Sequence, residues 1–176
     1  MKFIRIDKNN QINGVGLRCV IWVSGCENYC DECHNPETWD YNYGHELAQE
    51  EWETIKQQLS SPEISGITMT GGDPMAPGNR SAAAIFCMAI KQAFPNKTIW
   101  MYSGYLFEEI KDYLGAVDVL IDGKYDKALN PGLGKAKWRG STNQRVIDVQ
   151  SSLKEGHIVE YVDFNGKTIS ENERGE

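Results

Sequence analysis

Strand-like and helix-like segments alternate through most of this chain, which leaves few folds open to it. Short apolar runs typical of buried strands are separated by longer segments with apolar residues at helical spacing. The expected strands are 17–23, 64–70, 98–102 and 117–121, and the expected helices are 47–59, 81–94 and 105–114. Such alternation predicts βαβ units and a parallel sheet. Because 176 residues are too few for an eight-unit barrel, we expect one α/β domain with an incomplete (β/α) barrel or an open, mostly parallel sheet.

Glycine-bearing turns follow these predicted strands. Gly71-Gly72-Asp73-Pro74 follows the second strand, and Tyr102-Ser103-Gly104 ends the third. In parallel sheets the carboxyl ends of the strands are where ligands bind. A glycine backbone can approach a ligand closely because it has no Cβ. We therefore expect a ligand site here, and ordinary strand-ending turns are the alternative interpretation.

The pattern weakens after Leu129. Residues 145–149 and 157–162 are possible strands, and Asn165-Gly166 is a hairpin-turn signal. We expect residues 1–176 to form a single domain, with a divergent extension over about 150–176 whose last seven residues are disordered. Cys19, Cys87 and three tryptophans, Trp22, Trp52 and Trp100, fall in apolar segments and are expected in the core.

Bulk composition narrows the functional classes. The net charge is −7 and the pI is about 5.0, which argues against a nucleic-acid binder, because such proteins usually carry a basic face. No apolar run is long enough for a signal peptide or a membrane span. We therefore expect a cytoplasmic protein without a membrane partner, whose thiols stay reduced.

Three of the five cysteines lie close together in the sequence. Cys26, Cys30 and Cys33 form a C-x₃-C-x₂-C pattern directly after the first predicted strand. Three thiolates can bind three irons of a [4Fe–4S] cluster, whose usual complement is four cysteines. The fourth iron would then be open to a small molecule, as one position is in a catalytic zinc site.

Two other metal-binding interpretations stay open at this point. A structural zinc site would need a fourth ligand, and His34 is directly adjacent to Cys33, which is an awkward geometry. Cys30-Asp-Glu-Cys33-His34 also matches the C-x-x-C-H pattern of c-type haem attachment. That interpretation leaves Cys26 without a role.

The cysteine loop resembles the signature of the radical S-adenosylmethionine superfamily. Within it, four further stretches are similar to the activating proteins of anaerobic ribonucleoside-triphosphate reductase: Asn13–Arg18, Cys33–Trp39, Gly71–Met75 and Trp138–Arg145. The resemblance runs from about residue 12 to about residue 147.

This resemblance implies an iron–sulfur oxidoreductase that uses a [4Fe–4S] cluster and S-adenosyl-L-methionine. The implied metal ligands are Cys26, Cys30 and Cys33, and the implied cofactor-binding residues are Glu32, Cys33, His34, Gly71, Gly72, Asp73, Tyr102, Ser103 and Gly104. Asp73 would complement the positive charge of the methionyl ammonium. Many superfamily members carry an aromatic residue where this chain has Glu32, so His34 is the alternative contact to adenine.

The implied reaction is reductive cleavage of S-adenosylmethionine, followed by abstraction of a Cα hydrogen from a glycine of the partner. The implied partners are the large subunit of the reductase and a flavodoxin-like electron donor. Arg18, Arg139 and Arg145 could contact cofactor or partner, although exposed arginines are more often solvated. Alternatives are an activase of another glycyl-radical enzyme, such as pyruvate formate-lyase, and a non-enzymatic iron–sulfur electron carrier.

Overall fold

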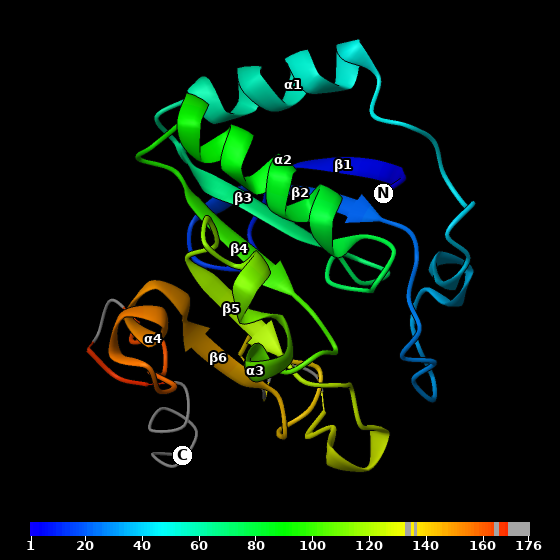
Figure 1. The fold of residues 1–176 in the computed structure, drawn as a ribbon, viewed down its shortest axis with the longest axis vertical. Coiled ribbons are helices and arrows are strands. Elements are labelled where there is room, and N and C mark those ends of the chain that lie inside the picture. The colour runs from blue at the N-terminus through cyan, green and yellow to red at the C-terminus, as the bar shows by residue number, and fades with distance from the viewer. Residues whose placement is uncertain (133–134, 136, 164–165, 169–176) are drawn as a thin grey trace.

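A mixed six-stranded sheet forms the centre of the molecule (Figure 1). The computed structural model describes residues 1–132, 135, 137–163 and 166–168. The strands are β1 (Phe3–Asn10), β2 (Leu17–Val23), β3 (Ile64–Gly71), β4 (Thr98–Tyr102), β5 (Val119–Asp122) and β6 (Arg145–Asp148). The helices are α1 (Gln49–Ser60), α2 (Arg80–Ala93), α3 (Phe107–Ile110) and α4 (Val149–Glu155), with 3₁₀ turns at Pro36–Trp39, Lys111–Tyr113 and Lys127–Leu129.

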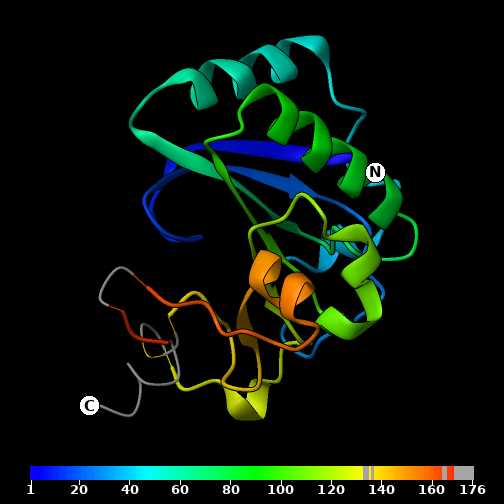
Figure 2. The ribbon, with the colours of Figure 1, turned by 60° about the vertical axis from the view of Figure 1, so that its left-hand side comes forward.

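The strands lie in the sheet in the same order as in the chain. The four central strands, β2 to β5, run parallel to one another, whereas the edge strands β1 and β6 pair antiparallel with β2 and β5. Crossovers between parallel strands are nearly always right-handed, so strands added in one direction place their connecting helices on one face. Figures 1 and 2 show α1 and α2 together on one side of the sheet, and α4 packs against β5 and β6. The expected α/β class is confirmed, with a mixed sheet whose four central strands are parallel.

Alternate residues of each strand enter different cores, as the two-residue period of a strand requires. The larger core lies between the sheet and the helices, and each strand contributes to it, for example through Ile21, Met69, Met101, Leu120 and Ile147. A smaller cluster on the opposite face contains Trp100, Val119, Ile121 and Val146, packed against Val15, Tyr102, Trp138 and Tyr161. The sheet is therefore buried on both faces near its middle, which explains the almost continuous apolar runs of its parallel strands.

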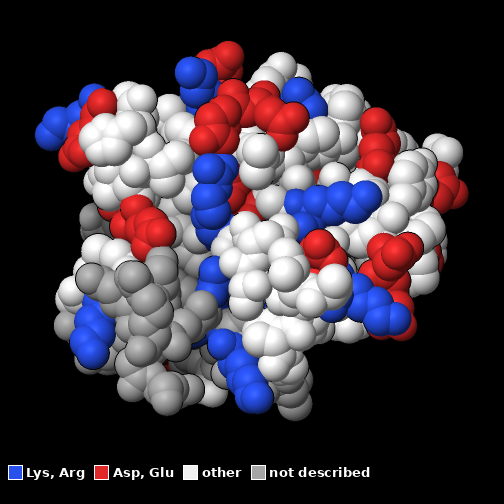
Figure 3. Space-filling view, turned by 90° about the horizontal axis from the view of Figure 1, so that it is seen from below, with Lys and Arg blue, Asp and Glu red and all other residues white. Residues whose placement is uncertain are grey.

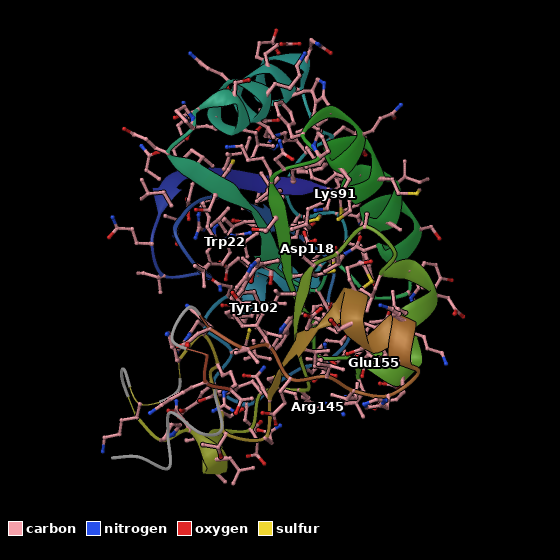
Figure 4. The ribbon with its side chains drawn as sticks, turned by 90° about the vertical axis from the view of Figure 1, so that its left-hand side faces the viewer. Trp22, Lys91, Tyr102, Asp118, Arg145 and Glu155 are labelled. Atoms are coloured by element: carbon pink, nitrogen blue, oxygen red, sulfur yellow. The ribbon has the colours of Figure 1, made fainter. Side chains whose placement is uncertain are left out.

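An ion pair joins the helix layer to the sheet. Lys91 Nζ, near the end of α2, lies 2.8 Å from Asp118 Oδ2 (Figure 4). The same carboxylate oxygen accepts a hydrogen bond of 2.6 Å from the backbone N–H of Ile99 in β4. Asp118, the residue just before β5, therefore connects that strand to α2 and β4.

Arg18 could have contacted the cofactor or partner or been solvated, but it is fully buried on the helix-free face of β2. Its guanidinium donates to Thr68 Oγ1 at 2.6 Å and to the carbonyl of Ile67 at 2.6 Å. It also donates to Thr98 Oγ1, the Thr98 carbonyl and the Val15 carbonyl. Burial lowers the pKa of Arg18 to about 10, so the group stays charged at neutral pH. Arg18 thus ties β2, β3 and β4 together from inside the sheet.

Two elements were not expected from the sequence. β1 has only one buried residue, Phe3, and its polar remainder gives no strand-like apolar pattern. α4 begins where a longer sixth strand was expected, because the Asp148 side chain accepts from the backbone N–H of Ser151 and caps the helix. It ends at Gly156, which has the left-handed conformation common at helix ends.

Other expectations need correction. The helix expected over 105–114 is one α-helical turn, Phe107–Ile110, followed by a 3₁₀ turn. The strand expected over 157–162 is reduced to isolated bridges from Glu160 to Ile147 and from Val162 to Thr168. Trp100 is buried as expected, but Trp22 and Trp52 are only half-buried.

Only part of the predicted C-terminal hairpin and tail lies within the described residues. Gly166 has a φ of 75°, as a hairpin turn requires, whereas Asn165 and the disordered end expected over 170–176 lie outside the described residues. Across the described ranges, no helix combines the length and apolar character that a membrane crossing requires.

Candidate functional site

A cavity of about 270 Å³ opens where the parallel strands end. The loops after β2, β3, β4 and β5 all contribute to its lining. Every residue that the sequence placed in the site lines it: Cys26, Cys30, Glu32, Cys33, His34, Gly71, Gly72, Asp73, Tyr102, Ser103 and Gly104. The topology therefore brings together residues that are separated by as many as 78 positions, from Cys26 to Gly104.

The cysteine loop leaves β2 and is held by backbone hydrogen bonds. The Gly25 N–H donates to the Thr38 carbonyl at 2.7 Å, and the Cys26 N–H donates to the Trp39 carbonyl at 3.2 Å. Between the cysteines, Tyr29 and Glu32 have φ angles of 46° and 54°, a region that residues other than glycine rarely adopt. Such strained conformations cluster at ligand sites, where the surrounding structure enforces them.

The three thiols of this loop are free of disulfides. Cys26 is buried, and Cys30 and Cys33 are half-buried at the cavity wall. Among the described residues, no three Cys, His, Asp or Glu side chains converge closely enough to hold a single metal ion. In a cubane each thiolate binds a different iron. Three free thiols on one loop at the cavity wall are a donor set that fits such a cluster.

The Gly71-Gly72 turn packs directly against the strand and loop that carry the cysteines. Gly71 has a φ of 113°, and a Cβ there would lie 2.4 Å from the carbonyl oxygen of Val23. A Cβ on Gly72 would lie 2.7 Å from the Gly25 carbonyl oxygen and 2.9 Å from that of Thr38. The sequence suggested that these glycines make room for a ligand. The structure shows that they also make room for the backbone of the cysteine loop.

We expect Gly71→Ala to destabilise the fold by about 2–3 kcal/mol, because the side chain would meet both an unfavourable φ and the Val23 carbonyl. Gly115→Ala is the matched control, since nothing lies within 4 Å of its added Cβ and its φ is not positive. Urea unfolding of both variants checks this. Equal stabilities for the two would contradict the packing role of Gly71.

Asp73 is 1% exposed, and both of its carboxylate oxygens accept hydrogen bonds from other residues of the chain. Oδ1 accepts from the Met75 N–H at 2.8 Å. Oδ2 accepts from Asn28 Nδ2 and the Gly104 N–H, both at 2.8 Å, and from Ser103 Oγ at 3.2 Å. Burial raises the pKa of Asp73, and these hydrogen bonds oppose that shift. Asp73 therefore joins the loops after β2, β3 and β4, whereas its contact with a ligand ammonium stays a prediction.

The remaining predicted residues lie around this centre. Tyr102 lies on the side of the sheet away from α2 (Figure 4), and burial raises the pKa of its phenol. Ser103 Oγ accepts from the Tyr105 N–H while it donates to Asp73, which makes it part of the turn. His34 is exposed at the cavity mouth, and Glu32 pairs with Lys127 at 2.5 Å.

Two arginines that could have contacted a ligand have other partners. Arg145 pairs with the buried Asp122 and with Glu108, which joins the start of β6 to β5 and α3. Arg139 donates to the Gln144 carbonyl at 2.8 Å. Neither residue lines the cavity.

Sequence reasoning missed two asparagines. Asn79, buried before α2, donates through Nδ2 to the carbonyls of Ser24, Gly25 and Asp73. Asn28, between the first two cysteines, donates to Asp73 and lines the cavity. An isolated asparagine in a loop carries no periodic or spacing signal, so neither role is visible before the fold is known.

Comparison with known proteins identifies the family. A family model described as a 4Fe-4S single cluster domain matches residues 12–147. The anaerobic ribonucleoside-triphosphate reductase-activating protein of Enterobacteria phage T4 is 41% identical over 148 residues, which cover 83% of this chain and 93% of that protein. The protein of the same name from Vibrio cholerae is 40% identical over 140 residues, covering 76% and 88%. The chain belongs to this activating-protein family.

The family assignment agrees with the cysteine loop and with the span of the resemblance. The Escherichia coli K12 member is 35% identical over 142 residues, which cover 77% of this chain and 90% of that protein. A [4Fe–4S] cluster is thus the metal group of this domain, and the zinc and haem interpretations are set aside. The cavity beside the cysteines is where a second cofactor would contact such a cluster.

Proposed function

We propose that this chain activates an anaerobic ribonucleoside-triphosphate reductase by installing a glycyl radical on its large subunit. The proposal rests on one observation. The three free cysteines and the turns after three successive parallel strands line the same cavity. An electron carrier needs no such cavity. The named relatives support the choice of reductase among possible partners.

Cys26, Cys30 and Cys33 would hold three irons of the cluster. The other two cysteines, Cys19 and Cys87, are buried in the core on the helix side, where they cannot serve as a fourth ligand. The open iron would be the site of S-adenosylmethionine. When bound, these two groups supply one-electron cleavage of the sulfonium and hydrogen abstraction from a glycine Cα.

The chain's own residues would bind and orient the nucleotide. Among the described residues, none donates a hydrogen bond to the Gly72 carbonyl oxygen, which leaves it available to the methionyl ammonium. The Gly71-Gly72 turn packs closely against β2 and the cysteine loop. Tyr102, Gly104 and His34 would line the rest of the site, with His34 against adenine.

The consecutive parallel strands with helices on one face support an incomplete radical S-adenosylmethionine barrel. α4 packs on β5 and β6, so the start of the extension over 150–176 would belong to a single domain spanning 1–176. A flavodoxin-like protein would supply the electron, and the chain would act in the cytoplasm.

The surface near the site offers charges of both signs to a protein partner. Figure 3 shows Lys and Arg side chains intermixed with Asp and Glu on the face seen from below. Near the cavity mouth, Lys127 pairs with Glu32 in this way. Such a surface suits a protein partner better than a nucleic-acid backbone, which selects a continuous basic face.

The test uses anaerobically reconstituted, reduced protein with S-adenosylmethionine and the purified reductase. We expect 5′-deoxyadenosine to form and a glycyl radical to appear on the reductase by electron paramagnetic resonance. Cleavage without a radical on the reductase, but with one on pyruvate formate-lyase, would favour the other activase. No cleavage at all, despite a reduced cluster, would favour an electron carrier.

A further inference from the structure

Asn28 is placed to act on the first cysteine of the loop. Its Nδ2 lies 3.5 Å from Cys26 Sγ and 2.8 Å from Asp73 Oδ2. A side-chain amide has two N–H groups, so one nitrogen can serve both acceptors at once. Cys26 therefore receives a side-chain hydrogen bond from Asn28, whose amide is held at the same time by Asp73.

The surrounding structure fixes the orientation of this amide. Asp73 Oδ2 accepts from Asn28, so the nitrogen of the amide, and not its oxygen, must face the carboxylate and the sulfur. Asp73 is itself held by the backbone N–H groups of Met75 and Gly104. On the other side, a Cβ on Gly104 would lie 2.3 Å from Asn28 Nδ2. The absence of a side chain at Gly104 thus leaves the space that Asn28 occupies.

We propose that Asn28 is a positioning residue that orients Cys26 and raises the reduction potential of the cluster. This inference rests on the proposed function, in which Cys26 binds one of the irons. A hydrogen bond to a ligating sulfur stabilises the added negative charge of the reduced cluster, and such bonds are among the determinants of cluster potential. Asp73 acts through Asn28, because its carboxylate holds the amide against the sulfur.

Asn28→Leu is the direct test, since leucine has a similar size and no donor. In the absence of S-adenosylmethionine, we expect a more negative midpoint potential at equal iron and sulfide content. We also expect a changed paramagnetic resonance spectrum of the reduced cluster. Asn28→His should recover part of the shift, because its Nδ1 is attached to Cγ, as the asparagine Nδ2 is. The melting temperature of the apo-protein shows that each variant is folded.

Two further variants keep the test decisive. Gly104→Ala displaces the Asn28 amide without removing it, so it should shift the potential in the same direction. Asn42→Leu makes the same chemical change in an exposed loop outside the cavity and should leave the potential unchanged. If Asn28→Leu assembles no cluster, Gly104→Ala decides the question.

Different experimental results would contradict the role of Asn28 and the proposed function. If wild-type protein takes up a cluster but both Asn28→Leu and Gly104→Ala keep its potential and spectrum, the role of Asn28 is wrong and the proposed function stands. If wild-type protein takes up no cluster on these cysteines, the proposed function fails and the inference falls with it.

Discussion

Replacing Cys26, Cys30 or Cys33 individually by serine should abolish cluster binding and 5′-deoxyadenosine formation while leaving the fold intact. Each thiolate would bind its own iron, so no remaining cysteine can substitute for the one removed. The loop is held to residues 38–39 by backbone hydrogen bonds that do not involve the sulfurs. Iron content, visible absorption and far-ultraviolet circular dichroism of each anaerobically reconstituted variant measure the effect.

Cys87→Ala is the matched control for these variants. Cys87 is 1% exposed in the core between α2 and the sheet, and burial raises the pKa of its thiol to about 12. Its loss should cost about 1–2 kcal/mol of stability through a small cavity and leave the cluster in place. A full cluster in Cys30→Ser, or loss of the cluster in Cys87→Ala, would contradict the assignment of the ligands.

Arg18→Met should produce the largest loss of stability, on the order of 3–5 kcal/mol. Methionine fills a similar volume but leaves the carbonyls of Ile67 and Val15 and the hydroxyl of Thr68 without the guanidinium that they contact. Unsatisfied polar groups in a buried site each cost about 1–3 kcal/mol. For a chain of 176 residues this corresponds to a fall in melting temperature on the order of 10 °C.

Arg5→Met makes the same change on the exposed face of the sheet edge. Arg5 forms a local ion pair with Asp7, and its Cζ lies 3.9 Å from the ring centroid of Trp22. Its loss should cost less than about 1 kcal/mol, as is usual for exposed ion pairs. Thermal unfolding of both apo-proteins provides the comparison. A fall in melting temperature as small for Arg18→Met as for Arg5→Met would show that the buried hydrogen bonds do not stabilise the sheet.

The parallel part of the sheet could be predicted because each strand carries its own local signal. β4 has the expected bounds, Thr98–Tyr102, since a short apolar run lies between polar turns. β1 and α4 could not be predicted in this way. β1 pairs at an edge through its backbone, and its side chains are mostly polar. α4 is seven residues long, and its boundary depends on the capping contact of Asp148.

The cysteine ligands and the glycine turns of the site could be predicted from the sequence. The hydrogen bonds that hold these loops together could not. The spacing of the cysteines is a local property, and glycine turns after parallel strands are expected at one edge of the sheet. The Asp73 carboxylate accepts hydrogen bonds from Asn28 and Gly104, which lie in loops far from it in the sequence. No local pattern predicts such contacts. Contact with a ligand was one possibility for Arg18 and solvation was the other, yet it is buried in the sheet. Nothing in an apolar strand reveals which hydrogen-bond acceptors the neighbouring strands will present.

Mössbauer spectroscopy of ⁵⁷Fe-reconstituted protein, with and without S-adenosylmethionine, tests the central claim most directly. The claim is that three thiolates, on Cys26, Cys30 and Cys33, leave one iron of the cluster open to the nucleotide. The expected result is a cluster in which one iron of the four changes its spectrum when S-adenosylmethionine is added. Four irons with unchanged spectra, in a cluster fully ligated by the protein, would contradict the account.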